Sequence, residues 1–159
     1  MLSIRRANIA DAALLRTLIR ELAEFERELE LCVIEEEDLQ QDGFGEAPKF
    51  HALIAEWSGE PAGYALFFGY YSSWVGRGLY LEDVFVRPQF RGKGIGMGLL
   101  AAAAKFAVQG GYRAMRWEVL DWNENAIGIY KALGAKFRDQ WRSVLLKDEA
   151  LRRLAERTP

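Results

Sequence analysis

The sequence predicts an α+β fold, an α/β three-layer arrangement in which a mostly antiparallel mixed sheet is flanked by helices. Three observations lead to this prediction. Two helical patterns near the N-terminus are followed by three strand patterns in direct succession, the order that antiparallel neighbours produce. A further strand pattern follows one intervening helix, so at least one crossover connection is expected. Half of the 159 residues are hydrophobic, which suits one domain spanning residues 1–159.

The first part of the chain predicts one strand and two helices. Residues 2–7, "LSIRRA", form a short strand. Residues 11–30 carry apolar side chains at helical spacing, and Asp11 is a suitable cap for that helix. Residues 34–45, "IEEEDLQQDGFG", predict a second short helix, which Gly43 ends.

The middle of the chain predicts a set of strands and then a helix. Residues 49–71 read as two strands around a turn at "SGEP", and residues 78–88 as a third strand that Pro88 ends. Residues 99–111, "LLAAAAKFAVQGG", predict an alanine-rich helix closed by its two final glycines.

The last third alternates again between strands and helices. Residues 114–120, "AMRWEVL", predict a strand. Residues 123–134, "NENAIGIYKALG", predict a helix that Gly134 closes. Residues 140–146, "QWRSVLL", predict a last strand before a charged C-terminal helix.

The formal net charge of -2 conceals an uneven distribution. Between Glu21 and Asp42 there are ten acidic residues and one basic residue, Arg27, so the remainder has a basic excess. Such a segment concentrates cationic ligands near it, although most of its carboxylates fit a solvated helix face. Basic residues are not clustered with aromatic ones on one element, which argues against a nucleic-acid partner.

Cysteine and hydropathy patterns indicate a cytoplasmic protein without a metal site. One cysteine, Cys32, and one histidine, His51, form neither an internal disulfide nor a metal cluster. The N-terminus has no apolar signal core. The longest uncharged stretch, from Pro61 to Gly76, is interrupted by Ser and Gly and is short for a membrane span, so no membrane partner is expected.

The stretch "RPQFRGKGIGMGLL" contains four alternating glycines. A dinucleotide fingerprint fails, because the position three places after the second glycine holds Met97 or Leu99. A triphosphate loop fails because Lys93 is followed by Gly94 and not by Ser or Thr. What remains is a glycine-rich turn before a helix, whose unpaired N–H groups suit an anion. Its alternative is a turn that binds nothing.

The segment "RGKGIG" resembles the pyrophosphate-binding motif of the GNAT acetyltransferases, Gln/Arg-x-x-Gly-x-Gly/Ala, at Arg91, Gly94 and Gly96. "RELAEFE", "DGFG", "YLED", "WNE" and "YKALGA" occur in the same order in the diamine N-acetyltransferases, the spermidine/spermine enzymes and their thialysine-acetylating relatives. The resemblance covers the chain from about Ile4 to Trp141. It implies a GNAT-like sheet, a single N-acetyltransferase domain and acetyl-CoA as co-substrate.

The chemistry requires a base and benefits from an acid. A primary amine has a pKa of about 10.4 and must lose a proton before it attacks a thioester, and the departing thiolate leaves more readily when protonated. By resemblance Glu82 is the base, acting through a water, and Tyr130 is the acid to the coenzyme sulfur. The plain alternatives are an exposed strand position for Glu82 and a core position for Tyr130.

The resemblance also implies the residues that bind acetyl-CoA. The strand backbone before the glycine-rich turn pairs with the pantetheine arm and polarises the acetyl carbonyl. The helix start at "NENA" is a second contact, and its Asn123 is also a good helix cap. The full set is Val84, Phe85, Val86, Arg91, Gly92, Lys93, Gly94, Ile95, Gly96, Met97, Asn123, Glu124, Asn125 and Ala126.

The acceptor side departs from the polyamine pattern. The residues implied to bind the acceptor are Phe25, Glu26, Glu82, Arg116, Trp117 and Glu118. Phenylalanine stands where the polyamine enzymes have tyrosine, which is closer to the thialysine branch. A fixed positive charge at Arg116 would repel a long polycation and could pair with the carboxylate of a lysine-like amino acid. A short loop between Ala135 and Trp141 is a further departure.

The leading hypothesis is therefore an acetyl-CoA-dependent N-acetyltransferase for a small cationic amine, with polyamine and aminocarboxylate acceptors both open. The alternatives are a peptide or protein N-acetyltransferase and a non-catalytic acyl-CoA-binding sensor. The resemblance also implies a homodimer.

Overall fold

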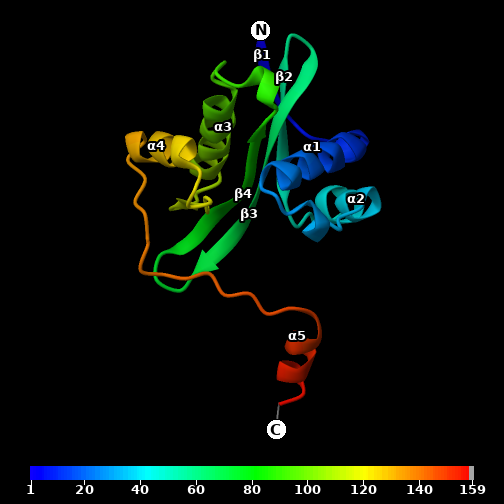
Figure 1. Ribbon diagram of the computed structural model, residues 1–159, viewed down its shortest axis with the longest axis vertical. Coiled ribbons are helices and arrows are strands. Elements are labelled where there is room, and N and C mark those ends of the chain that lie inside the picture. Colours follow the sequence, from blue (N-terminus) through cyan, green and yellow to red (C-terminus); the bar gives the residue numbers. More distant parts are fainter. Residues whose placement is uncertain (158–159) are drawn as a thin grey trace. The chain divides into compact units, whose positions relative to one another are not determined.

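A computed structural model describes residues 1–157, shown in Figure 1. These residues form two compact units, one from Met1 to Glu118 and one that begins at Val119. All of the sheet lies in the first unit, with the strand order β1-β2-β3-β4-β5. The predicted α+β class is confirmed. A single domain over the whole chain stays a prediction.

The first unit contains the five strands, three of the helices and three short 3-10 turns. These are β1 (Leu2–Arg6), η1 (Ile9–Asp11), α1 (Ala12–Phe25), η2 (Leu29–Leu31), α2 (Glu36–Phe44), β2 (His51–Trp57), β3 (Glu60–Ser72), β4 (Gly76–Val86), η3 (Pro88–Phe90), α3 (Ile95–Gln109) and β5 (Met115–Arg116). The second unit contains α4 (Glu124–Ala132) and α5 (Asp148–Ala155).

The sheet of the first unit is covered by helices on both faces. Strands β1 to β4 are antiparallel neighbours, and β5 is parallel to β4 after the α3 crossover. Helices α1 and α2 cover one face and α3 covers the other (Figure 1). Under α1 and α2 lies a core that includes Leu15, Leu18, Ile54 and Tyr64, all fully buried.

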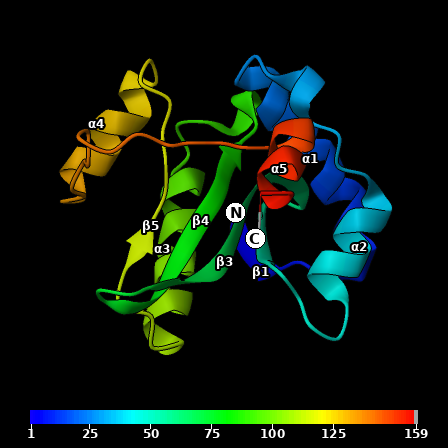
Figure 2. The ribbon, with the colours of Figure 1, turned by 90° about the horizontal axis from the view of Figure 1, so that it is seen from below.

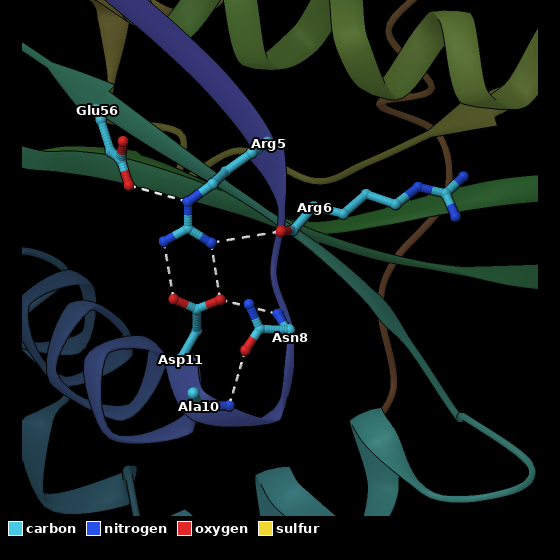
Figure 3. Close-up of polar contacts among 6 residues, drawn as sticks. All are labelled: Arg5, Arg6, Asn8, Ala10, Asp11 and Glu56. Atoms are coloured by element: carbon cyan, nitrogen blue, oxygen red, sulfur yellow. Dashed lines mark hydrogen bonds and ion pairs between the residues drawn. The ribbon is translucent and has the colours of Figure 1, made fainter. Parts of the chain in front are cut away.

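An ion-pair cluster fixes the connection from β1 to α1, as Figure 3 shows. Arg5 donates from two guanidinium nitrogens to Asp11, both at 2.8 Å, and from Nε to Glu56 at 2.9 Å. Asp11 also accepts the backbone N–H of Asn8, whose own side chain caps η1 through Ala10 N. Asp11 is the N-cap residue of α1, as predicted, but its carboxylate makes no capping hydrogen bond to that helix, because it accepts from Arg5 and Asn8 instead.

Strand β4 contains a β-bulge at Glu82. Asp83 pairs with Leu66 and Leu81 pairs with Phe67, so Glu82 has no partner in β3. Before the bulge, Leu81 faces α3, because its partner Phe67 packs on Phe106 of that helix. After the bulge, the strand turns its other side to α1, as Asp83 hydrogen-bonds the core residue Tyr64. The side chains of β4 therefore do not alternate strictly between the two faces of the sheet at Glu82.

Several predicted boundaries differ from the structure. Helix α1 ends at Phe25 and not near Glu30, because Arg27 adopts a left-handed backbone with φ 64°. Gly43 lies inside α2, where a Cβ would run into the ring of Phe50, so its role is close packing.

One predicted strand is much shorter than expected, and another is not formed. The strand predicted over 114–120 is formed only at Met115–Arg116. Residues 140–146 are irregular within the described part of the chain, so the last predicted strand is wrong. Across residues 1–157, no helix combines the length and the apolarity that crossing a membrane requires.

Candidate active site

The edge of β4 that faces β5 is open over half of its length. Pairing between the two strands is confined to Leu79 with Met115 and Tyr80 with Arg116, and β5 lies beside only that part of β4 (Figure 2). From Leu81 to Val86, β4 pairs only with β3 among the described residues. The backbone predicted to pair with a pantetheine arm lies on this open edge. Val84, Phe85 and Val86 thus lie on a strand whose second edge has no strand partner at these positions among the described residues.

Carboxylates from three elements gather beside the bulge. Glu82 and Asp83 come from β4, Glu26 follows the last residue of α1, and Glu118 follows β5. Partial desolvation, and then the negative charge of Glu118, raises the pKa of Glu82. Desolvation, followed by the charges of Glu28 and Glu82, raises the pKa of Glu26. This concentration of negative charge is suited to a cation.

Asp83 is the most buried member of the group. Tyr64 donates its phenolic hydrogen to Asp83 Oδ2 at 2.8 Å. Burial raises the pKa of Asp83 to about 6, and the charges of Glu82 and Glu26 add to this, while the Tyr64 hydrogen bond opposes it. Burial and the neighbouring Asp83 charge raise the pKa of Tyr64 well above its ordinary value. This hydrogen bond thus ties one carboxylate beside the bulge to the core residue Tyr64.

Arg116 brings a positive charge to the same place. It lies opposite Tyr80 in the β4–β5 pair. Desolvation and the charges of Glu118 and Glu82 raise the pKa of Tyr80, and Arg116 opposes them. The Tyr80 hydroxyl is therefore influenced by two negative charges and one positive charge. A ligand that reaches it would interact with charges of both signs.

The glycine-rich turn has the form of an anion cradle. Gly92 and Gly94 have left-handed backbones, with φ 75° and 76°, and a Cβ on either would have no heavy atom within 4 Å. Gly94 is the N-cap of α3 and makes no side-chain hydrogen bond to the first N–H groups of the helix. Ile95 is buried and anchors the turn, while Gly96 and Met97 continue the first helical turn. The residues fit a pyrophosphate, which needs backbone donors and space.

The two cations of the turn each rest on an aromatic ring. The guanidinium carbon of Arg91 is 4.6 Å from the centroid of Phe25, and the Lys93 ammonium is 5.1 Å from that of Trp57. Arg91 also donates from Nε to the Val86 carbonyl at 3.0 Å. A hollow of about 410 Å³ opens between the end of α1 and the end of β4, and Phe25 and Arg91 line it.

The remaining predicted residues belong to α4 and its approach in the second unit. Asn123 accepts the backbone N–H of Ala126 at 3.3 Å and thus caps α4, as predicted. Glu124 and Asn125 lie exposed in its first turn. Tyr130 is half-buried on α4, and burial raises its pKa. Gly134 closes the helix with φ 80°. The catalytic and binding roles of these residues stay predictions.

Comparison with known proteins decides the family. Residues 13–135 match the acetyltransferase (GNAT) family. The chain is 43% identical over 163 aligned positions to the thialysine N-epsilon-acetyltransferase of Sus scrofa, with 96% of each chain covered. This chain belongs to the acetyltransferase (GNAT) family. It is an N-acetyltransferase, and the predicted family and enzyme class are confirmed.

More distant proteins agree with this membership. The chain is 35% identical to the spermidine/spermine N(1)-acetyltransferase-like protein 1 of Homo sapiens, covering 83% of this N-acetyltransferase and 20% of that protein. An integron cassette protein of V. cholerae has the same fold, with a TM-score of 0.80, 22% identity and 98% of both chains covered. An AAC(6')-Iy structure in complex with a CoA bisubstrate analogue has a TM-score of 0.68 and 24% identity, covering 94% of this chain and 99% of that one.

Three features of the N-acetyltransferase site escaped sequence analysis: the bulge at Glu82, the Asp83–Tyr64 pair and the position of Tyr80. One signal was present. Under strict alternation Asp83 would share a face with the buried Leu81 and Phe85, and a carboxylate in such a position indicates either a bulge or a functional role. Across residues 1–157, no three His, Cys, Asp or Glu side chains are arranged to hold a metal ion.

Proposed function

We propose that this N-acetyltransferase moves the acetyl group of acetyl-CoA to a primary amine of a small cationic acceptor, with lysine-like aminocarboxylates such as thialysine favoured over polyamines. The observation that carries the proposal is the meeting of Arg116 with the carboxylates of Glu82 and Glu118 around Tyr80. The similarity to a thialysine N-epsilon-acetyltransferase and to a spermidine/spermine N(1)-acetyltransferase-like protein supports the class of acceptor.

The donor side of the proposal rests on the cradle and the open strand edge. Gly92, Gly94 and the first N–H groups of α3 would hold the pyrophosphate, with Arg91 and Lys93 beside it. The exposed edge of β4 would pair with the pantetheine arm. When bound, acetyl-CoA supplies an acetyl thioester. The strand edge would aim N–H groups at the thioester carbonyl, where negative charge develops during attack.

Glu82 is proposed as the base that prepares the amine. Its raised pKa makes it a stronger proton acceptor than an ordinary glutamate. The nearby carboxylates of Glu26 and Asp83 attract the protonated amine to this place. Glu82 would then take the excess proton through a water.

Tyr130 is proposed as the acid that protonates the departing thiolate. Its phenol keeps its proton at neutral pH, because burial raises its pKa. A group of this kind suits a thiolate, whose conjugate acid has a pKa of about 8.5.

Arg116 is proposed to select the acceptor. A guanidinium is permanently charged and binds a carboxylate in a fork geometry. It would pair with the α-carboxylate of a lysine-like amino acid while the carboxylates beside the bulge hold the amine to be acetylated. A polyamine has no anion to offer, so Arg116 would repel it.

Free-thiol release from acetyl-CoA tests the function across a panel of thialysine, lysine, spermidine and spermine. The expected result is turnover with at least one amine, with the highest kcat/KM for an aminocarboxylate. No release above background with any amine would overturn the proposal.

Arg116→His tests the assignment of the acceptor. We expect kcat/KM to fall for thialysine and lysine and to rise for spermidine, with kcat for the best acceptor changing less than KM. Arg113→His is the matched control, because Arg113 lies just before β5 and donates to the Val75 carbonyl away from the carboxylates. Equal effects of both substitutions on all four amines would exclude a selective role for Arg116.

A further inference from the structure

Arg91 touches both sides of the proposed site. Its sequence position places it in the anion cradle, next to Gly92. Its guanidinium lies over the ring of Phe25, the residue predicted to contact the acceptor, with 4.6 Å between guanidinium carbon and ring centroid. All of these atoms belong to the first unit. One cation–π contact therefore joins a cation predicted to bind the donor to a ring predicted to contact the acceptor.

The other cations near the turn are held differently. Arg87 donates to both carboxylate oxygens of Glu21, at 2.7 and 2.8 Å, and to the Pro61 carbonyl, so its guanidinium is used in the fold. Lys93 rests on Trp57 at the end of β2, which is remote in sequence from the acceptor residues. Among the described residues, Arg91 forms no ion pair with a carboxylate, and its charge is available to an anion.

The geometry of Arg91 leaves its donors accessible. A stacked guanidinium uses its face for the ring and keeps its N–H groups in the plane, pointing outward. The Nε–H is directed to the Val86 carbonyl, which fixes the plane of the group at a second point. Ring and carbonyl together restrict a side chain that would otherwise lose considerable rotamer freedom on binding.

We propose that Phe25 is a positioning residue for the donor: it holds the Arg91 guanidinium so that its outward N–H groups meet the coenzyme pyrophosphate. This inference rests on the proposed function and assigns a second task to an acceptor-side residue. Because coupling between two sites is reciprocal, bound coenzyme fixes Arg91 and through it Phe25, so the amine binds more tightly to the coenzyme-loaded enzyme.

Calorimetric binding of CoA to the full chain, with no amine present, tests the proposal. Phe25→Leu removes the ring but keeps an apolar side chain, and we expect its Kd for CoA to rise about two- to five-fold, the range of an exposed cation–π contact. Phe25→Tyr restores the ring and should return the Kd to the wild-type value. In an Arg91→Gln background, Phe25→Leu should leave the Kd unchanged.

Two controls keep a structural effect apart from a positioning effect. Trp57→Leu removes the ring under Lys93, and its effect on the Kd should persist in the Arg91→Gln background. Pantetheine, which lacks the pyrophosphate, should bind wild type and Phe25→Leu equally. An unchanged Kd in Phe25→Leu, or an equal rise in both backgrounds, would overturn the inference. Failure of wild type to bind CoA would instead overturn the proposed function.

Discussion

Asp83 is a carboxylate held largely away from water beside the core. It faces Tyr64, a fully buried residue, and its neighbours Glu82 and Glu26 are also acidic. Folding therefore places negative charge where water is scarce, and the Tyr64 hydrogen bond offsets only part of this cost. A site that must attract a cation has a reason to retain this arrangement at the expense of stability.

This cost gives Asp83 a measurable pH signature. Its pKa is about 6 in the fold against 3.8 ordinarily, so the folded state binds the extra proton between these values. The free energy of unfolding should therefore fall as pH rises from about 4 to about 6. We expect Asp83→Asn to flatten this dependence and to raise stability at pH 7.5 by about 1–2 kcal/mol, measured by urea unfolding.

Tyr64→Phe is the matched change at the other end of the pair. It leaves Asp83 buried without its donor, so stability at pH 7.5 should fall by about 1–2 kcal/mol. If Asp83→Asn lowers stability at pH 7.5 as much as Tyr64→Phe does, the account of the pair is wrong.

Glu118 should affect the pH at which kcat/KM falls on the acidic side of the pH profile. Its negative charge favours the protonated form of Glu82 and so contributes to the raised pKa of that base. In Glu118→Gln, Glu82 stays ionised to lower pH. The acidic limb of the kcat/KM profile should therefore shift to lower pH, whatever the height of the plateau. Glu37→Gln, an exposed change on α2, is the control; an unmoved limb in Glu118→Gln would count against Glu82 as the base.

At the scale of elements, alternation and helical spacing predicted those parts of the chain that are stabilised locally or by simple burial. The hairpin from His51 to Ser72 and the helix from Ile95 to Gln109 were both anticipated. The end of α1 was not, because its stop is a left-handed Arg27 and no glycine marks it. The predicted strand over 140–146 has the right residues, but a strand also needs a neighbour, which composition does not reveal.

The candidate site also has parts that local sequence predicts and parts that depend on contacts between distant segments. The glycine-rich turn before α3 was predictable, because a left-handed backbone is a local property that glycine readily adopts. The bulge at Glu82 and the pair of Asp83 with Tyr64 depend on register between distant strands, which a single sequence does not fix.

Substitutions at two glycines, Gly94 before α3 and Gly98 within it, distinguish a role in CoA binding from a role in packing. Gly94 is left-handed and faces open space, whereas a Cβ at Gly98 would approach Ile4 Cδ1 to 2.9 Å. We expect Gly94→Ala to cost about 1–2 kcal/mol of stability and to weaken CoA binding. Gly98→Ala should alter stability by less, because the Ile4 end can move and alanine favours a helix. CoA titration and thermal unfolding distinguish the two variants. Equal affinities of Gly94→Ala and Gly98→Ala for CoA would contradict the role of the turn in binding pyrophosphate.

At the scale of the whole molecule, the question is the oligomeric state, and the second unit, taken by itself, carries many exposed apolar side chains. Val144 is 90% and Leu145 is 79% exposed, and Trp141, Leu146, Leu151 and Leu154 are exposed as well. Exposed apolar side chains in such number favour association. We propose that the enzyme is a homodimer in which these side chains are covered by a second copy.

Light scattering at micromolar concentration should give twice the chain mass for the wild type. Val144→Lys with Leu145→Lys should lower this mass towards that of one chain without loss of helix content. Val108→Lys is the control, since Val108 is 78% exposed on α3 of the first unit. A wild-type mass of one chain would refute the dimer.

Mass spectrometry of the acceptor after reaction with acetyl-CoA tests the central claim most directly, with free CoA measured in the same tube. The account predicts one acetyl group on thialysine or another small amine for each CoA released. It also predicts that Glu82→Gln binds CoA normally while kcat falls about 10²–10⁴-fold. CoA release without acetylated amine, or full turnover in Glu82→Gln, would contradict it.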